Sequence, residues 1–422
     1  MVDPARRARA EKVFKAFCKE YFPKRFYLEW SADHDRAAQL IEKAVRDGDL
    51  FAFAMPRGSG KTALAVAAVL WAVLCGYQRF VFVIAANAKK ASRILASVKA
   101  ELRGNLLLLE DFPEACYPIR KMEGISQRAH GQTCNGQPTQ IGWKEDQIIL
   151  PSIEGSKSAS AIIYICGKDA AIRGEQFTTP DGDLIRPGFF LIDDPQTDKS
   201  AKNPNRVEAD EKLLLGTILG SAGPGESLGA VMTCTVICEN DLSGRFLDHN
   251  RHPEWRGERT RMLRGWPKNF ALWEEYRQIQ VDSLKSGGDG HEATDFYAVH
   301  RALMDQGCEA AWEARKKKTQ LSAIQHAMDW FFLIGKTRFF AEMQNDPIPE
   351  ESEADRPITA EFIQSKANGL ERGLVPLDLT RLVCFIDCHK EFLFHGVAAV
   401  NDKFSGHIVD YGPFPGQKSN AA

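Results

Sequence analysis

Met55-Pro-Arg-Gly-Ser-Gly-Lys-Thr62 is the stretch of this sequence that decides the fold. An apolar run, Leu50-Phe-Ala-Phe-Ala54, precedes it, and a helix-forming run begins at Thr62. Gly58 and Gly60 allow the backbone to turn its N–H groups toward phosphate oxygens, and the N-terminus of the following helix adds partial positive charge. A strand, a glycine-containing turn and a helix in this order predict a phosphate-binding loop.

The side chains of this loop suit a magnesium–nucleotide complex. Lys61 can reach the β- and γ-phosphates, and the Thr62 hydroxyl can hold Mg²⁺. The predicted binding residues for ATP are Gly58, Ser59, Gly60, Lys61 and Thr62. Two features depart from the usual pattern, because Met55 replaces its first glycine and Arg57 lies inside the loop. The alternative is an ordinary turn, and the flanking strand and helix favour nucleotide binding.

Composition leaves the choice of partner to local features. A chain of 422 residues exceeds a single core and predicts two or three domains. The net charge of -2 gives no overall attraction to nucleic acid, so any DNA contact must come from local basic patches. Ten cysteines without histidines at zinc-site spacing indicate buried thiols in a reducing, cytoplasmic setting. The apolar run 63–75 is too short to span a membrane, and no signal peptide is visible.

An acidic strand end forms the second part of the predicted site. Phe189-Phe-Leu-Ile-Asp-Asp194 is an apolar run that ends in two acids. In phosphate-loop enzymes, one such acid holds the Mg²⁺ shell and the other orients the attacking water. We therefore predict Asp193 as a metal ligand and Asp194 as the residue that acts on water. The alternative is an acidic pair that caps the turn at Pro195.

Two arginines compete for the role of stabilising charge on the γ-phosphate. Arg173 is the candidate for an arginine finger from the same or a neighbouring subunit, with a surface salt bridge as its alternative. Arg57 can act in cis because it lies within the loop. Thr233 and Thr235, at the end of the next strand, can sense the γ-phosphate.

The order of apolar runs indicates an α/β fold. Strand, loop, helix, strand and helix in succession are typical of a parallel sheet, and further apolar runs give roughly five core strands. The predicted domains are an N-terminal helical segment 1–48, an ATPase core 49–265, a helical linker or lid region 266–350 and a β-rich region 351–422. Residues 3–20 predict one amphipathic basic helix. Tyr27 or Trp30 can stack on adenine, with packing against the core as the alternative.

With these motifs in order, the chain resembles the large subunit of tailed-phage terminases, the motor and nuclease that package viral DNA. The segments similar to family motifs are Pro56–Thr62, Ile172–Gly174, Leu191–Gln196, Thr233–Val236 with Glu239–Leu242, and Phe340–Pro347. They resemble, in turn, the arginine-bearing loop, the Arg-Gly element, the acidic strand, the coupling motif and the motor–nuclease junction. Cys234 departs from the family, which has glycine at that place.

The resemblance implies a P-loop NTPase with a mostly parallel sheet, a helical linker and a partial RNase H-like C-terminal domain. It implies Mg²⁺-dependent ATP hydrolysis that drives double-stranded DNA into a procapsid. The implied partners are a portal protein, a small terminase subunit and further copies of the chain in a ring, in the cytoplasm of a bacterial host. The alternatives are another P-loop DNA translocase or helicase-like ATPase, and an inactive prophage remnant.

The resemblance also implies a nuclease centre with two divalent metal ions. Val383–Cys388 looks like its first strand, with Asp387 as the first metal ligand, and two strands follow at Phe394–Val400 and His407–Tyr411. The later strand and terminal helix of that domain are absent from this sequence. We therefore expect an incomplete nuclease domain with little or no cleavage activity.

Overall fold

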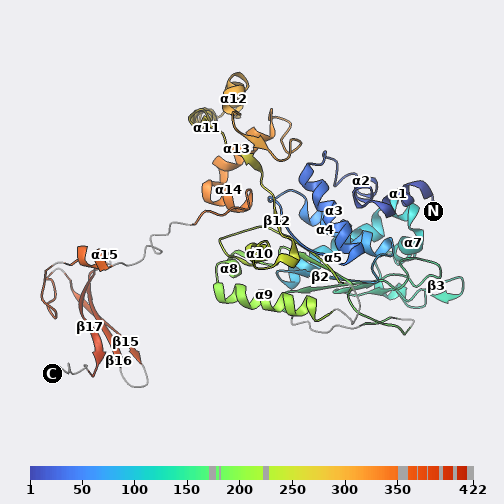
Figure 1. The fold of residues 1–422 in the computed structure, drawn as a ribbon, viewed down its shortest axis with the longest axis horizontal. Coiled ribbons are helices and arrows are strands. Elements are labelled where there is room, and N and C mark those ends of the chain that lie inside the picture. Colours follow the sequence, from blue (N-terminus) through green and yellow to red (C-terminus); the bar gives the residue numbers. More distant parts are fainter. Residues whose placement is uncertain are drawn as a thin grey trace. The chain divides into compact units, whose positions relative to one another are not determined.

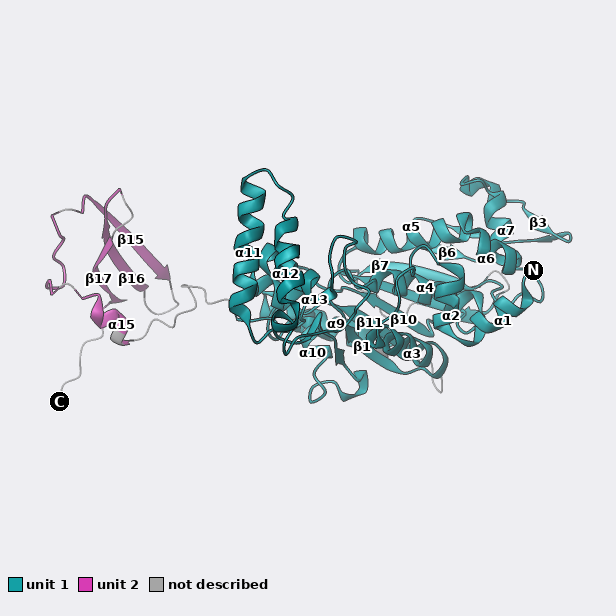
Figure 2. Ribbon diagram, turned by 90° about the horizontal axis from the view of Figure 1, so that it is seen from above, with its two compact units in different colours: residues 1–350 teal, residues 351–422 magenta. Residues whose placement is uncertain are grey.

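The computed structural model describes residues 1–170, 177–179, 182–221, 228–349, 360–367, 369–377, 379–388, 393–402 and 406–415 (Figure 1). The chain forms two compact units, residues 1–350 and 351–422, which are coloured separately in Figure 2. Each unit is described by itself below.

A mostly parallel sheet forms the centre of the first unit. Its strands lie in the order β12-β1-β11-β10-β2-β7-β6-β5. Their bounds are β1 (Leu50–Ala54), β2 (Phe80–Ala85), β5 (Gly142–Trp143), β6 (Gln147–Ile149), β7 (Ile162–Gly167), β10 (Phe189–Asp193), β11 (Gly229–Cys234) and β12 (Glu258–Arg259). Strands β12 through β7 pair in parallel, and β6 and β5 pair antiparallel at one edge. The predicted α/β class with a mostly parallel sheet is confirmed at this level.

Successive residues of these strands enter two different hydrophobic cores. Val81 and Val83 of β2 pack in one core, and Phe80, Phe82 and Ile84 pack in the other. Every residue of β2, β10 and β11 is buried, which explains why their sequences are almost entirely apolar. Helices α3 (Ala32–Asp47), α4 (Lys61–Leu74) and α5 (Ala88–Gly104) cover one face, and α9 (Pro204–Leu219) and α10 (Leu242–Phe246) cover the other (Figure 1).

The N-terminal segment differs from its prediction. Two helices, α1 (Pro4–Lys12) and α2 (Phe14–Tyr21), replace the single helix expected over residues 3–20, because Val13 is extended (φ -133°, ψ 116°). The break allows the Phe14 amide to donate to Glu42 Oε1 at 2.7 Å and the Phe14 ring to pack 5.4 Å from that of Trp71. Tertiary contacts therefore override the local helical pattern. Helix α3 ends at Gly48, whose left-handed backbone (φ 78°) suits glycine.

The first unit also contains several short helices and strands. They are α6 (Leu106–Asp111), α7 (Pro113–Lys121), β3 (Thr133–Cys134), β4 (Gln137–Pro138), β8 (Phe177–Thr178), β9 (Leu184–Ile185) and α8 (Asp198–Ala201), with 3₁₀ turns at Ser126–Ala129 and Pro253–Trp255. No helix in the described part of the chain is long and apolar enough to cross a bilayer. The apolar helix α4 is buried in the core instead.

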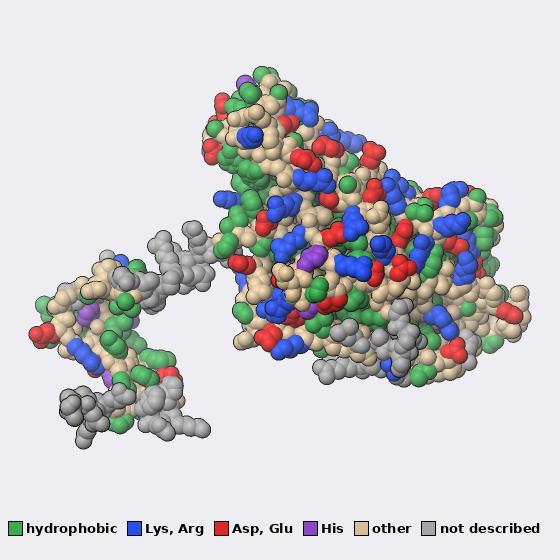
Figure 3. Space-filling model, viewed as in Figure 1, with side chains coloured by type: hydrophobic (Ala, Val, Ile, Leu, Met, Phe, Trp, Pro, Cys, Tyr) green, Lys and Arg blue, Asp and Glu red, His purple; other side chains and the backbone are tan. Residues whose placement is uncertain are grey.

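The linker region forms a hydrophobic cluster of its own. It contains β13 (Leu263–Gly265), α11 (Phe270–Lys285), α12 (His291–Met304), β14 (Glu309–Ala310), α13 (Ala323–Ile334) and α14 (Lys336–Glu342). Trp273, Tyr276 and Tyr297 are fully buried in this cluster. Figure 3 shows Lys and Arg side chains interspersed with Asp and Glu over the visible face of the first unit.

The second unit contains a three-stranded antiparallel sheet. Helix α15 (Ala360–Ser365) precedes β15 (Arg381–Cys388), β16 (Leu393–Val400) and β17 (Gly406–Phe414), which lie in chain order. All eight residues of β15 are exposed, and green apolar side chains are visible on this unit in Figure 3. The strands fall where the sequence places them, whereas the RNase H-like identity of this unit stays a prediction.

Candidate nucleotide-binding site

The loop between β1 and α4 presents donors at a helix N-terminus. Gly58 (φ 79°) and Gly60 (φ 88°) both adopt left-handed backbone angles, which glycine accepts without steric cost. Gly60 caps α4, and the first amides of an α-helix have no acceptor within it. A Cβ added at Gly60 would meet nothing within 4 Å, so the backbone here borders open space. The loop therefore has the form of an anion-binding turn.

Lys61 is held inside the site. Its side chain is buried, with 7% of the residue exposed, and Nζ donates to Met55 O at 2.8 Å and Thr235 Oγ1 at 2.9 Å. Burial lowers the pKa of Lys61, and the charges of Asp194 and Asp193 oppose that shift. The ammonium is thus fixed between the phosphate loop and the end of β11.

Each carboxylate oxygen of Asp193 accepts a hydrogen bond from a threonine hydroxyl. Because β10 and β11 are neighbours, Asp193 lies in register with Thr233, whose Oγ1 donates to Oδ1 at 2.7 Å. Thr62 Oγ1 donates to Oδ2 at 3.1 Å. Burial, followed by the nearby charge of Asp194, raises the pKa of Asp193 to about 6. The structure therefore brings together the two residues that the sequence assigns to magnesium.

Asp194 leaves the line of the strand. It has a positive φ of 41°, which is uncommon for a residue other than glycine and is better tolerated by Asp than by most others. Its amide donates to Thr233 O at 2.8 Å, and Thr235 Oγ1 lies 3.4 Å from Oδ1. Asp194 lines the same pocket as Lys61 and Thr62. The backbone turn thus directs the second acid to the cavity beside the loop.

The two predicted arginines have different outcomes. The Arg57 side chain is 65% exposed and forms a 2.9 Å ion pair with Glu342 of α14. The Arg57 amide also donates to Glu342 O at 2.8 Å. Arg173 lies outside the described residues. Arg57 thus lines the phosphate pocket, and its place as a catalytic residue stays a prediction.

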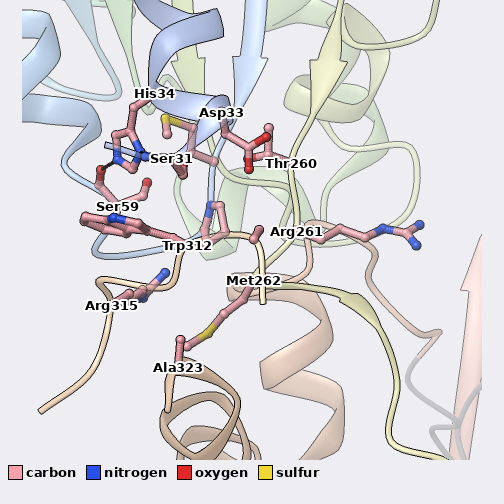
Figure 4. Close-up of a pocket in the computed structure, with 13 residues that line it drawn as sticks. Ser31, Asp33, His34, Ser59, Thr260, Arg261, Met262, Trp312, Arg315 and Ala323 are labelled. Atoms are coloured by element: carbon pink, nitrogen blue, oxygen red, sulfur yellow. Dashed lines mark hydrogen bonds between the residues drawn. The ribbon is translucent and has the colours of Figure 1, made fainter. Parts of the chain in front are cut away.

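Residues of the linker region also contact the phosphate loop. Trp312 and Arg315 line a small cavity together with His34 and Ser59 (Figure 4). His34 Nε2 lies 3.0 Å from Ser59 O, and the His34 and Trp312 rings are 4.4 Å apart. Arg315 donates to the carbonyl oxygen of Arg57, and burial lowers the pKa of Arg315 to about 10. Arg315 therefore stabilises the phosphate loop, although it lies 258 residues after Arg57 in the sequence.

Sequence reasoning missed a buried network that joins the loops after β10 and β11. Gln196 Nε2 donates to Asp241 Oδ2 at 2.6 Å and to Thr235 O at 3.1 Å. Asp241 is fully buried and accepts from the amides of Ile237 at 2.6 Å and Gly244 at 2.6 Å. Burial raises the pKa of Asp241, and these hydrogen bonds oppose the shift. The available signal was that each polar residue follows a buried strand closely.

The aromatic residues predicted for adenine lie away from the phosphate loop pocket. Tyr27 is 75% exposed, and Trp30 packs against Phe26 and His34 with ring centroids 5.5 and 5.8 Å away. Neither residue lines the pocket that contains Lys61 and Thr62. Packing against the core is the contact that the structure gives Trp30.

The predicted nuclease ligand has no cluster of acids around it among the described residues. Within that part of the chain, the metal-compatible group consists of the exposed residues Asp289, His291 and Glu292, far in sequence from Asp387. In the second unit, Asp387 pairs with Phe394 of β16, and Asp410 pairs with Val397. Because residues three apart on a strand point to opposite faces, the two acids lie on opposite faces of the sheet.

The donors of the first unit fit a magnesium–nucleotide complex. Hydroxyl and carboxylate oxygens are the ligands that Mg²⁺ prefers, and Thr62 and Asp193 place one of each 3.1 Å apart. Ser59 Oγ is buried without a partner among the described residues, so the loop holds a polar atom that its own fold does not satisfy. The pocket lined by Gly58, Gly60 and Lys61 is open to solvent.

The comparisons with known proteins find likeness only among solved structures. No protein-family model matches the chain, and no curated protein matches it. Among the solved structures that match is an arginine mutant of the ATPase domain of the large terminase from Thermus phage P74-26. It shares 13% identity at a TM-score of 0.35, over 62% of this chain and 90% of that domain. A likeness this distant carries no argument about function.

Proposed function

We propose that the first unit is a Mg²⁺-dependent ATPase and that it serves as the motor of a DNA-packaging terminase. The observation that best supports ATPase activity is the contact between Thr62 and Asp193, which lie 3.1 Å apart at the mouth of the phosphate-binding loop. Nucleotide-bound Mg²⁺ requires a phosphate loop and a strand-end acid that lie close enough to bind the same ion. The motif order of terminases supports the packaging role.

Each side chain has a distinct task in this proposal. Lys61 and the amides at Gly58–Thr62 would hold the phosphates, and Thr62 and Asp193 would hold Mg²⁺, which would supply positive charge to offset that of the phosphates. Asp194 faces the same pocket and orients the attacking water. Thr235 contacts both Lys61 and Asp194, so it is placed to detect loss of the γ-phosphate. Arg57, which lines this pocket, is the arginine of the same chain that would stabilise charge on the γ-phosphate.

The remaining parts of the proposal come from the terminase resemblance. Double-stranded DNA is the polymer moved, and a portal protein, a small terminase subunit and a ring of copies complete the machine. In the second unit, Asp387 would be the first ligand of a two-metal nuclease centre. The opposite-face placement of Asp387 and Asp410 offers that centre no support from the described strands.

ATP turnover of the purified chain tests the proposal. Lys61→Ala should abolish turnover, whereas Lys89→Ala, at an exposed position nearby, should leave it unchanged. Stimulation by double-stranded DNA without strand separation supports the packaging motor, and unwinding of a duplex supports the helicase-like alternative. Turnover that survives Lys61→Ala contradicts the assignment of the loop, and a folded protein without turnover matches the inactive remnant.

A further inference from the structure

A second hollow lies beside the phosphate pocket and is lined by aromatic residues. The residues that line both spaces are Arg57, Gly58, Arg338 and Glu342, so the two spaces meet at the phosphate loop. Trp312 and Trp330, both half-buried, lie in the wall of the second hollow. None of the motifs recognised in the sequence contains either tryptophan.

Trp330 is held in a fixed orientation. Its Nε1 donates to His326 Nε2 at 3.2 Å, and His326 Nδ1 lies 2.8 Å from Gln320 Oε1. Burial, followed by the charge of Arg315, lowers the pKa of His326 to about 4. The imidazole is therefore neutral at physiological pH, so that Nδ1–H donates to Gln320 while Nε2 accepts from Trp330.

Trp312 is likewise anchored by its polar edge. Its Nε1 donates to Glu29 O at 2.6 Å, and its ring meets His34 edge to face. Both indole N–H groups are therefore engaged within the protein, and the tryptophans offer the hollow apolar ring surface. Leu28, Ile334 and Met343 add aliphatic surface to the same wall.

We propose that this hollow binds the base of the nucleotide whose phosphates lie at Gly58–Thr62. The inference rests on the proposed ATPase function and names the part of the ligand that the linker region recognises. Aromatic stacking of a base contributes roughly 1–3 kcal/mol, and side chains fixed before binding lose little entropy. Lys316 and Lys317 border the hollow and favour an anionic ligand. The larger ring of a purine covers more of this wall than a pyrimidine does.

This placement replaces Tyr27 and Trp30 as the aromatic partners of the base. The linker region then contacts the nucleotide directly, because Trp330 belongs to α13 and Trp312 belongs to the segment before it. A base in the hollow contacts side chains far downstream of the phosphate loop in sequence.

The test compares ATP with inorganic tripolyphosphate in the full chain, by calorimetry in the presence of Mg²⁺. Trp330→Leu should weaken ATP binding roughly 10- to 100-fold and leave tripolyphosphate binding unchanged, because only the base is affected. Trp330→Phe should restore most of the affinity. Trp143→Leu, at a half-buried tryptophan outside the hollow, should leave both ligands unaffected.

Trp312→Leu is the second variant, needed because Trp330 also packs in the linker core. Equal ATP affinity in wild type and both folded leucine variants overturns the inference, as does selective loss of single-stranded oligonucleotide binding in them. Lys61→Ala separates the two proposals, since it should weaken ATP and tripolyphosphate together. Wild-type protein that binds neither ligand contradicts the proposed function itself.

Discussion

The hydroxyl of Thr62 donates a 3.1 Å hydrogen bond to Asp193, a residue 131 positions later in the chain. The contact exists because α4 begins directly above the carboxyl ends of β1, β11 and β10, which lie side by side in the sheet. Parallel α/β sheets place binding sites at these strand ends. The same arrangement brings Lys61 to Thr235 and Asp194 to the pocket.

Gly60 tests whether the loop is shaped for a ligand. Gly60→Ala should destabilise the fold by about 1–2 kcal/mol through its positive φ and should also abolish nucleotide binding, because the methyl group enters the phosphate space. Gly155→Ala is the matched control, since Gly155 also has a positive φ (77°) and open space around its Cβ. Thermal melting and ATP binding measured on both variants check this. Equal ATP binding by the two would show that the loop has no such role.

Asp193 carries a stability cost that removal of its charge should relieve. Its native pKa, raised from 3.8 to about 6, means that the folded state holds the proton more tightly, so stability falls as pH rises through that window. Asp193→Asn should therefore stabilise the ligand-free protein above pH 6, on the order of 1–3 kcal/mol, and less at lower pH. Denaturant titrations at several pH values measure the gain. A variant less stable than wild type at pH 7.5 would rule out this electrostatic account.

Glu211 of α9 tests the opposite case, a carboxylate stabilised by its neighbours. Burial acts to raise its pKa, but hydrogen bonds from Arg251, His252 and Arg245 lower it to about 2. Its contribution should therefore be present above its ordinary pKa and be lost as pH falls toward 2. Glu211→Gln should cost roughly 3 to 5 kcal/mol, because it leaves the buried guanidinium of Arg245 without its charged partner.

Glu208→Gln on the same helix is the control for this variant, because the Glu208 side chain is 55% exposed. It should leave the free energy of unfolding unchanged. The prediction fails if the two variants have equal midpoints in urea.

The sequence predicts the sheet because parallel strands that are buried on both faces must be apolar throughout. It also predicts the phosphate loop and the acids, since a strand, a glycine-containing turn and a helix follow one another, and a second apolar run ends in Asp193 and Asp194. The register that pairs Asp193 with Thr233 is a property of the assembled sheet, and no local pattern contains it. The break at Val13 likewise depends on Glu42 and Trp71, which are distant in sequence.

The aromatic hollow was beyond prediction for the same reason. Trp312 and Trp330 reach the phosphate loop only because the linker region docks through Arg315 and Glu342 onto the backbone of Arg57. The sequence placed these tryptophans in a helical region without indicating which side they face. Prediction succeeded where a residue's neighbours in sequence determine its surroundings and failed where distant segments do.

The most direct test of the shared magnesium site is ATP binding with and without Mg²⁺ in wild type, Thr62→Val and Asp193→Asn. Both substitutions preserve shape while removing a metal ligand. Wild-type affinity should rise strongly with Mg²⁺, and both variants should retain Mg²⁺-free binding through Lys61 while losing that rise. If Mg²⁺ strengthens ATP binding equally in all three proteins, Thr62 and Asp193 do not hold the ion and the account is wrong.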